Sequence, residues 1–275
     1  LIKIGKGFLL READIEKALM EFDIMPDVIG DVRWIHRQDN SKDWYFVTPQ
    51  KRSSFKGSVT FAAVGSVELW NPVTGETEPV KAEVKNGCTV VDLDMPIGGS
   101  CFIVIDRTGK HVNPEETDNS VIADINGVWS LTFPEGWGAP AQIETERLKP
   151  WCELPVSDEA KAFSGTVRYT VSFNLDASAD GNVVLDLGRV SSVAEVRVNG
   201  KPAGTLWCSP YITEIGKYVQ PGKNILEIDV TSTWFNRLVY DASLKESERK
   251  TWVINGPDCD SELVPYGLLG PVSIR

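Results

Sequence analysis

The stretch that decides the fold is residues 183–239, VVLDLGRVSSVAEVRVNGKPAGTLWCSPYITEIGKYVQPGKNILEIDVTSTWFNRLV. Its short runs alternate apolar and polar residues between turn residues, the pattern of antiparallel strands that bury one face. Asn199 and Gly200 follow such a run at residues 194–198, and both tolerate positive φ, so the pair predicts a type I′ hairpin turn. Pro221 and Gly222 predict a second turn. We therefore expect consecutive antiparallel strands whose connecting loops are free to bind a ligand or another domain.

The rest of the chain continues this pattern on both sides of a polar segment. Apolar residues recur at helical spacing only within residues 12–22 of the first half, which predicts one N-terminal helix. Short strands are predicted from residue 32 to residue 105, among them 80–84, and again from residue 129 to residue 274. Residues 157–162 predict one helical turn, and residues 240–250 either a short helix or a surface excursion. The polar segment 108–120 marks the expected domain boundary.

We therefore predict an all-β fold of two antiparallel β-sandwich domains with a short N-terminal helix. The sandwich domains are expected at residues 28–118 and 119–275. Residues 1–27 precede them as a strand and a helix.

Composition indicates a globular chain and disfavours several partners. The 275 residues are 42% hydrophobic and 24% charged, as in proteins that bury a core. The net charge is −11 and lysine and arginine form no cluster, so binding to nucleic acid or to an anionic membrane surface is disfavoured. No apolar run reaches the length of about 18 residues that a spanning helix needs, so no membrane insertion is expected.

Cysteine and histidine indicate no metal centre. The five cysteines are widely spaced, no CxxC pair occurs, and the only histidines are His36 and His111. A zinc site is therefore not predicted, and no cofactor motif is present. The odd number of scattered cysteines favours buried free thiols over a disulfide framework, with Cys101 and Cys208 in apolar strands.

Aromatic residues near loops of the second domain are candidate sugar contacts. A sugar ring presents an apolar C–H face that stacks on an aromatic ring, while nearby polar groups bond its hydroxyls. Packing in the core or between domains is the alternative, because burying each ring would contribute about 2–3 kcal/mol. The candidates are Trp207, Tyr211, Trp234 and Trp252.

Asn236 and Arg237 stand beside Trp234 and are the polar candidates for the same site. Their amide and guanidinium groups would supply directional hydrogen bonds next to the indole. The alternative for Arg237 is a structural ion pair with Asp241 or Asp229. Three further tryptophans lie within strand patterns and are expected in the core: Trp34, Trp70 and Trp129.

Six segments of the second domain occur in an order that is specific in combination. They are NGVWSL (126–131), FSGTVRY (163–169), VRVNG (196–200), GTLW (204–207), WFNRL (234–238) and GLLGPV (267–272). On these segments the domain resembles the galactose-binding-like jelly rolls of multidomain glycoside hydrolases, including the sugar-binding domain of family 2. With PDV (26–28), FV (46–47) and LWNPVTGE (69–76), the whole chain resembles the C-terminal part of glycoside hydrolase family 106, the α-L-rhamnosidase-like enzymes.

This resemblance implies an ancillary part of a glycan-degrading enzyme. In that family the catalytic carboxylates and a calcium ion belong to an N-terminal barrel, so no catalytic or metal-binding residue is carried over to this chain. Residues 1–27 would be a remnant of the barrel region. The implied role is to support the catalytic barrel and to contact a plant or host glycan, in a periplasmic or extracellular enzyme. An independent carbohydrate-binding module and a complete small glycosidase are the alternatives.

The alternative of a complete glycosidase would need two suitably spaced carboxyl groups, and the sequence does not single out a pair. The densest acidic segment holds Asp258, Asp260 and Glu262, which would lie near Asp241 if the fold brings the segments together. A solvated loop, a Ca²⁺ site and a catalytic pair are the three interpretations of this segment. Its spacing lacks the glycine and the distal glutamate of an EF-hand loop.

Overall fold

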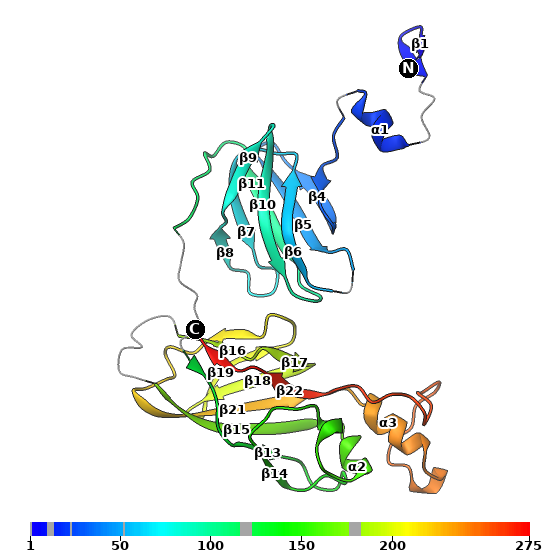
Figure 1. Ribbon diagram of the computed structural model, residues 1–275, viewed down its shortest axis with the longest axis vertical. Helices are drawn as coiled ribbons and strands as arrows, with labels where there is room; N and C mark the ends of the chain where they lie inside the picture. Colours follow the sequence, from blue (N-terminus) through cyan, green and yellow to red (C-terminus); the bar gives the residue numbers. More distant parts are fainter. Residues whose placement is uncertain (1, 10–13, 23, 52, 116–122, 176–182) are drawn as a thin grey trace. The chain divides into compact units, whose positions relative to one another are not determined.

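The computed structural model describes residues 2–9, 14–22, 24–51, 53–115, 123–175 and 183–275. Contacts divide the chain into two compact units, Leu1–Glu116 and Thr117–Arg275, and each is built from antiparallel sheets (Figure 1). The prediction of an all-β fold with a short N-terminal helix is confirmed. The exact domain limits stay a prediction. No helix among the described residues is both long enough and apolar enough to cross a membrane.

In the first unit, two sheets enclose one core. Their strand orders are β3-β6-β10-β9 and β4-β5-β11-β7-β8. Fully buried residues of both sheets, such as Phe61 and Ile103, belong to the same hydrophobic cluster, which makes the unit a β-sandwich. The strands are β3 (Val28–Ile29), β4 (Val32–Gln38), β5 (Lys42–Pro49), β6 (Phe55–Phe61), β7 (Ser66–Trp70), β8 (Thr77–Pro79), β9 (Ala82–Lys85), β10 (Cys88–Met95) and β11 (Cys101–Asp106).

Two expectations for this unit differ from the structure. Of the run expected as one strand at residues 80–84, residues 82–84 belong to β9, whereas residues 80 and 81 connect β9 to β8 in the other sheet, so the chain crosses the sandwich at this point. Trp34 was expected in the core, yet 39% of its surface is exposed. It lies on β4, the outermost strand of its sheet, where neighbouring strands cover the ring from one side only. Trp70 is half-buried.

The N-terminal residues of the first unit form a hairpin and a helix that contribute no residue to a core. β1 (Ile2–Ile4) pairs with β2 (Gly7–Leu9), and α1 (Ile15–Met20) is capped by the Asp14 side chain. The helix expected at residues 12–22 is thus present, although residues 12 and 13 lie outside the described part. No residue of these three elements is buried.

The second unit holds a six-stranded sheet, β14-β13-β15-β21-β18-β19, and a four-stranded sheet, β12-β23-β16-β20 (Figure 1). Residues of both sheets share one core, which includes Trp129, Tyr169 and Leu185. β17 (Arg189–Ser191) pairs with β22 (Gly267–Gly270). The other strands are β12 (Ala123–Asp124), β13 (Trp129–Thr132), β14 (Gln142–Thr145), β15 (Thr166–Leu175), β16 (Val184–Asp186), β18 (Val193–Val198), β19 (Lys201–Leu206), β20 (Ile212–Glu214), β21 (Gly222–Thr231) and β23 (Ser273–Ile274).

The hairpin in the second unit forms as its turn residues require. Asn199 and Gly200 have φ values of 52° and 74°, and β18 pairs with β19 across them. Trp129 is buried in the core, as expected.

The second unit also contains three short helical elements and one longer helix. The expected helical turn is present as α2 (Asp158–Lys161), which follows the 3₁₀ turn η1 (Trp151–Glu153). The segment after β21 is helical earlier than expected, because α3 (Phe235–Ala242) begins five residues before Tyr240. The 3₁₀ turn η2 (Glu246–Glu248) follows it.

All five cysteines are free. Cys101 is buried as expected, and burial raises the pKa of its thiol to about 11. Cys208 is only half-buried and Cys259 is exposed, so the expectation of buried thiols does not extend to the whole set.

Candidate functional site

The loops that carry the candidate residues leave the six-stranded sheet at one end. Thr166, the first residue of β15, and Val193, the first of β18, both pair with Thr231, the last of β21. β19 ends at Leu206, opposite Ala194. The loops after β21 and after β19 therefore start from the same end of the sheet. Because neighbouring strands lie about 4.8 Å apart, these two starting points, with β18 between them, are about 10 Å apart.

Exposed indoles occupy the loops that start from this end. Trp207 follows β19 directly and exposes 62% of its surface, and Trp234 precedes α3 and exposes 47%. Trp252 lies in the segment that follows α3 and exposes 75%. The three rings are thus open to contact from outside the unit, as a stacking platform for a sugar must be.

The other two uncharged candidates are buried and use their polar atoms within the unit. Tyr211 is 6% exposed, belongs to the core and donates from its hydroxyl to the carbonyl of Ser192 at 2.7 Å. Asn236 has no exposed surface, and its amide donates to the carbonyl of Val264 and accepts from the Val264 N–H, both at 2.8 Å. These bonds tie α3 to the segment at residue 264, which precedes β22. Direct sugar contact by these two residues stays a prediction.

Arg237 is buried and paired with two carboxylates. Its Nη2 lies 2.6 Å from Oδ1 of Asp241 one helical turn later, and its Nη1 donates to Oε1 of Glu159 on α2 at 2.9 Å. The ion pair with Asp241 is one of the two alternatives that the sequence left open for this arginine. The other, Asp229, instead accepts from Arg168 on β15 and Arg197 on β18.

Two aromatic rings flank the buried guanidinium. The Cζ atom of Arg237 lies 5.6 Å from the ring centre of Trp137 and 5.2 Å from that of Tyr240. Its Nε has no hydrogen-bond partner among the described residues. Trp137 in turn packs against Trp234, with ring centres 5.1 Å apart and planes inclined by 58°. The buried guanidinium of Arg237 therefore packs against Trp137, and Trp137 in turn packs against the exposed Trp234.

Lys250, in the segment after α3, adds further hydrogen bonds to this cluster. Its ammonium donates to the carbonyl of Gly136 at 2.8 Å and to Oε1 of Glu159 at 3.1 Å. The N–H groups of Lys250 and Thr251 donate to Oδ2 of Asp241 at 3.0 and 2.6 Å. These bonds fix the backbone directly before Trp252.

The electrostatics of this end keep three of its carboxylates ionised. Hydrogen bonding from Arg237 holds the pKa of Glu159 below its usual range. Burial acts to raise the pKa of Asp241, but hydrogen bonds from Arg237 and Thr251 outweigh it and the pKa is lowered. Hydrogen bonds from Arg168 likewise lower the pKa of Asp229. A glycosidase general acid needs a raised pKa, so these three groups are not suited to that role.

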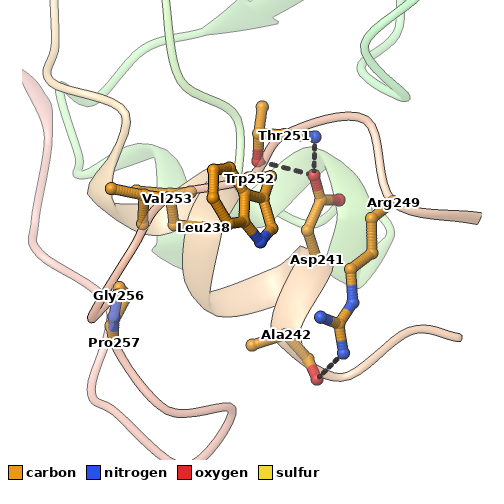
Figure 2. Close-up of a pocket in the computed structure, with 9 residues that line it drawn as sticks. All are labelled: Leu238, Asp241, Ala242, Arg249, Thr251, Trp252, Val253, Gly256 and Pro257. Atoms are coloured by element: carbon orange, nitrogen blue, oxygen red, sulfur yellow. Dashed lines mark hydrogen bonds between the residues drawn. The ribbon is translucent and has the colours of Figure 1, made fainter. Parts of the chain in front are cut away.

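Two adjoining pockets lie between α3 and the segment that follows it. The smaller pocket has a volume of about 120 Å³. It is lined by Leu238 and Asp241 of α3 and by Arg249, Thr251 and Trp252 of the segment that follows α3 (Figure 2). The larger, open pocket of about 600 Å³ shares part of this lining, including Arg249. Figure 2 shows Arg249 and Trp252 reaching from the same segment toward the helix.

The acidic segment expected near Asp241 lines the larger pocket with Asp258 and Asp260. Asp241 lines the smaller pocket but is 1% exposed and faces Arg237. Within the described ranges, no group of three or more histidine, cysteine, aspartate or glutamate residues is arranged to hold a metal ion.

Three residues of this end were not singled out from the sequence. Trp137 lies in the loop between β13 and β14, within the run Pro-Glu-Gly-Trp-Gly, where glycines beside an aromatic residue are a weak loop signal. Glu159 lies on the expected helical turn, but its pairing with Arg237 joins positions 78 residues apart. Arg249 stands in a polar run that gives no local sign of a pocket.

Comparison with known proteins identifies what the chain is similar to. A family model described as alpha-L-rhamnosidase, glycoside hydrolase family 106, matches residues 1–84. The rhamnosidase of Novosphingobium sp. PP1Y superposes on 99% of this chain with a TM-score of 0.80 and 34% sequence identity. A curated Formosa agariphila protein named "Putative beta-glucuronidase" is 34% identical over 178 residues, 55% of this chain. The chain covers 27% of the rhamnosidase and 15% of the Formosa protein.

Proposed function

Because the chain is an α-L-rhamnosidase-like protein of glycoside hydrolase family 106, we propose that it is the non-catalytic C-terminal portion of such an enzyme. In this proposal it supports the catalytic domain. It contacts the carbohydrate through the loops that leave the six-stranded sheet after β19 and β21, here called the loop end of the second unit. The observation that carries the proposal is the exposure of Trp207, Trp234 and Trp252 on loops from one end of a single sheet. We further propose that this unit is a galactose-binding-like jelly roll.

Three carboxylates of this end are unsuited to act as a general acid, which supports a non-catalytic role. Glu159, Asp229 and Asp241 are each held by arginine and have lowered pKa values. A general acid must hold its proton near neutral pH, which requires the opposite shift.

The partner in this proposal is the catalytic domain, and the N-terminal residues supply a surface for it. From Ile2 to Met25 the described residues expose large apolar side chains, including Ile4 at 60% and Ile15 at 73%. Exposed apolar surface of this extent is typical of a face that packs against another protein surface. The second partner is a plant or host glycan, and the proposed location is periplasmic or extracellular, where such polymers are degraded.

Titration of the purified chain against a panel of plant and host glycans tests the carbohydrate contact. We expect measurable binding that the double variant Trp207→Ala/Trp252→Ala abolishes, because both stacking surfaces are removed. Trp34→Ala is the matched control, since this exposed indole lies on a strand of the first unit and should leave binding unchanged. Unfolding midpoints of the variants equal to that of the parent chain would show that neither change unfolds it.

An assay with an aryl α-L-rhamnoside tests the non-catalytic role. We expect no hydrolysis by the purified chain. Turnover that disappears on replacing one carboxylate would instead support a complete small glycosidase. Glycan binding by the isolated chain, with no stable association to the catalytic domain, would support an independent carbohydrate-binding module.

A further inference from the structure

The two pockets beside α3 are open depressions that adjoin each other on the loop end. They share the lining residues Ala242, Arg249 and Pro257, so they form one continuous depression. The larger pocket, about 600 Å³, falls within the range of small-ligand sites, roughly 300–1,000 Å³. Trp252 borders the smaller pocket and exposes 75% of its surface, although burying such a ring would be favourable.

We propose that this depression binds an uncharged sugar unit of a glycan, with the indole of Trp252 as the stacking platform and Arg249 as the donor to its hydroxyls. This inference rests on the proposed carbohydrate contact and assigns it to one pocket and one ligand class. Asp258 and Asp260 accept hydrogen bonds from hydroxyls of the adjoining sugar in the larger pocket.

The backbone and the guanidinium around Trp252 are held in place before any ligand binds. Asp241 accepts from the N–H of Thr251, directly before Trp252, at 2.6 Å. Arg249 donates from Nε to the carbonyl of Leu244 at 3.1 Å and from Nη2 to that of Ala242 at 3.4 Å. Its Nη1 makes no hydrogen bond to the part of the chain that the structure describes. A donor in a fixed orientation, beside a ring whose backbone is anchored, reduces the entropy cost of binding.

The lining presents charged groups of both signs, which an uncharged ligand with donors and acceptors can bond together. Asp241 is neutralised by its ion pair with Arg237, so it adds no net charge to the smaller pocket. Arg249 borders both pockets, whereas Asp258 and Asp260 border only the larger one. An anionic sugar would meet two carboxylates, and a cationic one would meet the guanidinium. A neutral sugar has hydroxyls that donate to carboxylates and accept from arginine, so it suits both groups.

Calorimetric titration of the full chain with three sets of oligosaccharides tests this assignment. The sets are neutral (glucose-, mannose-, galactose-, xylose- and rhamnose-based), anionic (galacturonate and glucuronate) and cationic (glucosamine). We expect binding in the neutral set, and Trp252→Ala should weaken it by about three- to tenfold or more. Arg249→Gln should weaken it as well. Ile254→Ala is the matched control, because this side chain is 71% exposed on the same segment and lines neither pocket.

The outcomes separate this inference from the broader proposal. Neutral-glycan binding that Trp252→Ala leaves intact and Trp207→Ala removes would overturn the pocket assignment while the carbohydrate role stands. Preferential binding of uronates or glucosamine oligomers would overturn the assigned ligand class. Binding of none of the three sets would overturn both. Circular dichroism and thermal unfolding of each variant verify that the compared chains are folded.

Discussion

Arg237 shows at the residue scale how burial decides the role of a polar side chain. It is 1% exposed, paired with Asp241 and Glu159, and flanked by the rings of Trp137 and Tyr240. A buried cation is tolerated only while its partners remain, because an uncompensated charge in the interior is strongly unfavourable. Its partners therefore determine the stability of the loop end.

Asp241→Asn should lower the free energy of unfolding by about 3–5 kcal/mol, because it leaves the buried Arg237 with one carboxylate partner fewer. Urea-induced unfolding followed by tryptophan fluorescence measures the change. Asp258→Asn is the control, since this exposed carboxylate should alter stability by no more than about 0.5 kcal/mol. Equal small effects of the two variants would contradict the structural role of the ion pair.

Acidification should destabilise the second unit. The pKa values of Glu159, Asp229 and Asp241 are lower in the folded chain than in the unfolded one. Their contribution to stability is therefore full above the unfolded pKa values, about 4, and is lost as the pH falls through the folded ones. Unfolding midpoints between pH 7 and pH 3 measure this, and Asp241→Asn should reduce the slope. Stability that rises on acidification would contradict the assigned directions.

At the scale of elements, the β18–β19 hairpin does more than reverse the chain. Asn199 adopts the left-handed conformation that the turn needs, and its amide also donates to the carbonyl of Tyr218 at 2.9 Å and to Oδ1 of Asn224 at 2.8 Å. Its Oδ1 accepts from the N–H of Ile225 at 2.9 Å. The turn is thereby tied to the start of β21, a link that the turn signal in the sequence does not reveal.

Asn199→Ala should cost about 1–3 kcal/mol, since it removes these hydrogen bonds and places a Cβ-bearing residue without a local polar group at positive φ. Asn199→Gly keeps the conformation and should cost less. Chemical unfolding of both variants, with Lys201→Ala on the neighbouring exposed position as control, measures the difference. If the alanine and glycine variants were equally stable, backbone conformation would not contribute at this turn.

The elements also differ in how far local pattern predicts them. Strands with one buried face, such as β15, alternate strictly along their length and are predicted with small errors at the ends. The run 80–84 has the pattern of one strand, but only residues 82–84 lie in β9, because the chain passes from one sheet to the other at residues 80 and 81.

At the scale of the whole molecule, the residues before Val28 leave large apolar side chains exposed, and the contact between Phe8 and Phe22, whose ring centres are 5.5 Å apart, does not bury them. None of β1, β2 and α1 contributes a buried residue, although their side chains are largely apolar. The chain covers only 27% of the rhamnosidase it resembles in structure. Both observations support the proposal that further protein covers this surface.

We expect the purified chain to self-associate through this surface. Replacing Ile4, Ile15 and Ile24 with lysine should reduce the association, because these side chains are 60%, 73% and 52% exposed. Light scattering during size-exclusion chromatography measures it, and Val84→Lys, at an exposed position on β9, is the control. The unfolding midpoint should stay unchanged in the triple variant, and a clear decrease would show that these residues stabilise the unit itself.

The sequence by itself determined the features that depend on neighbouring residues. Alternation along strands, the Asn199-Gly200 turn, the capped turn at α2 and the family resemblance are all encoded within short windows. Only the tertiary structure decided which indoles are exposed and which partners Arg237 has. Burial and ion pairing depend on segments far apart in the chain, as when Glu159 meets Arg237 across 78 positions, and no local pattern carries that information.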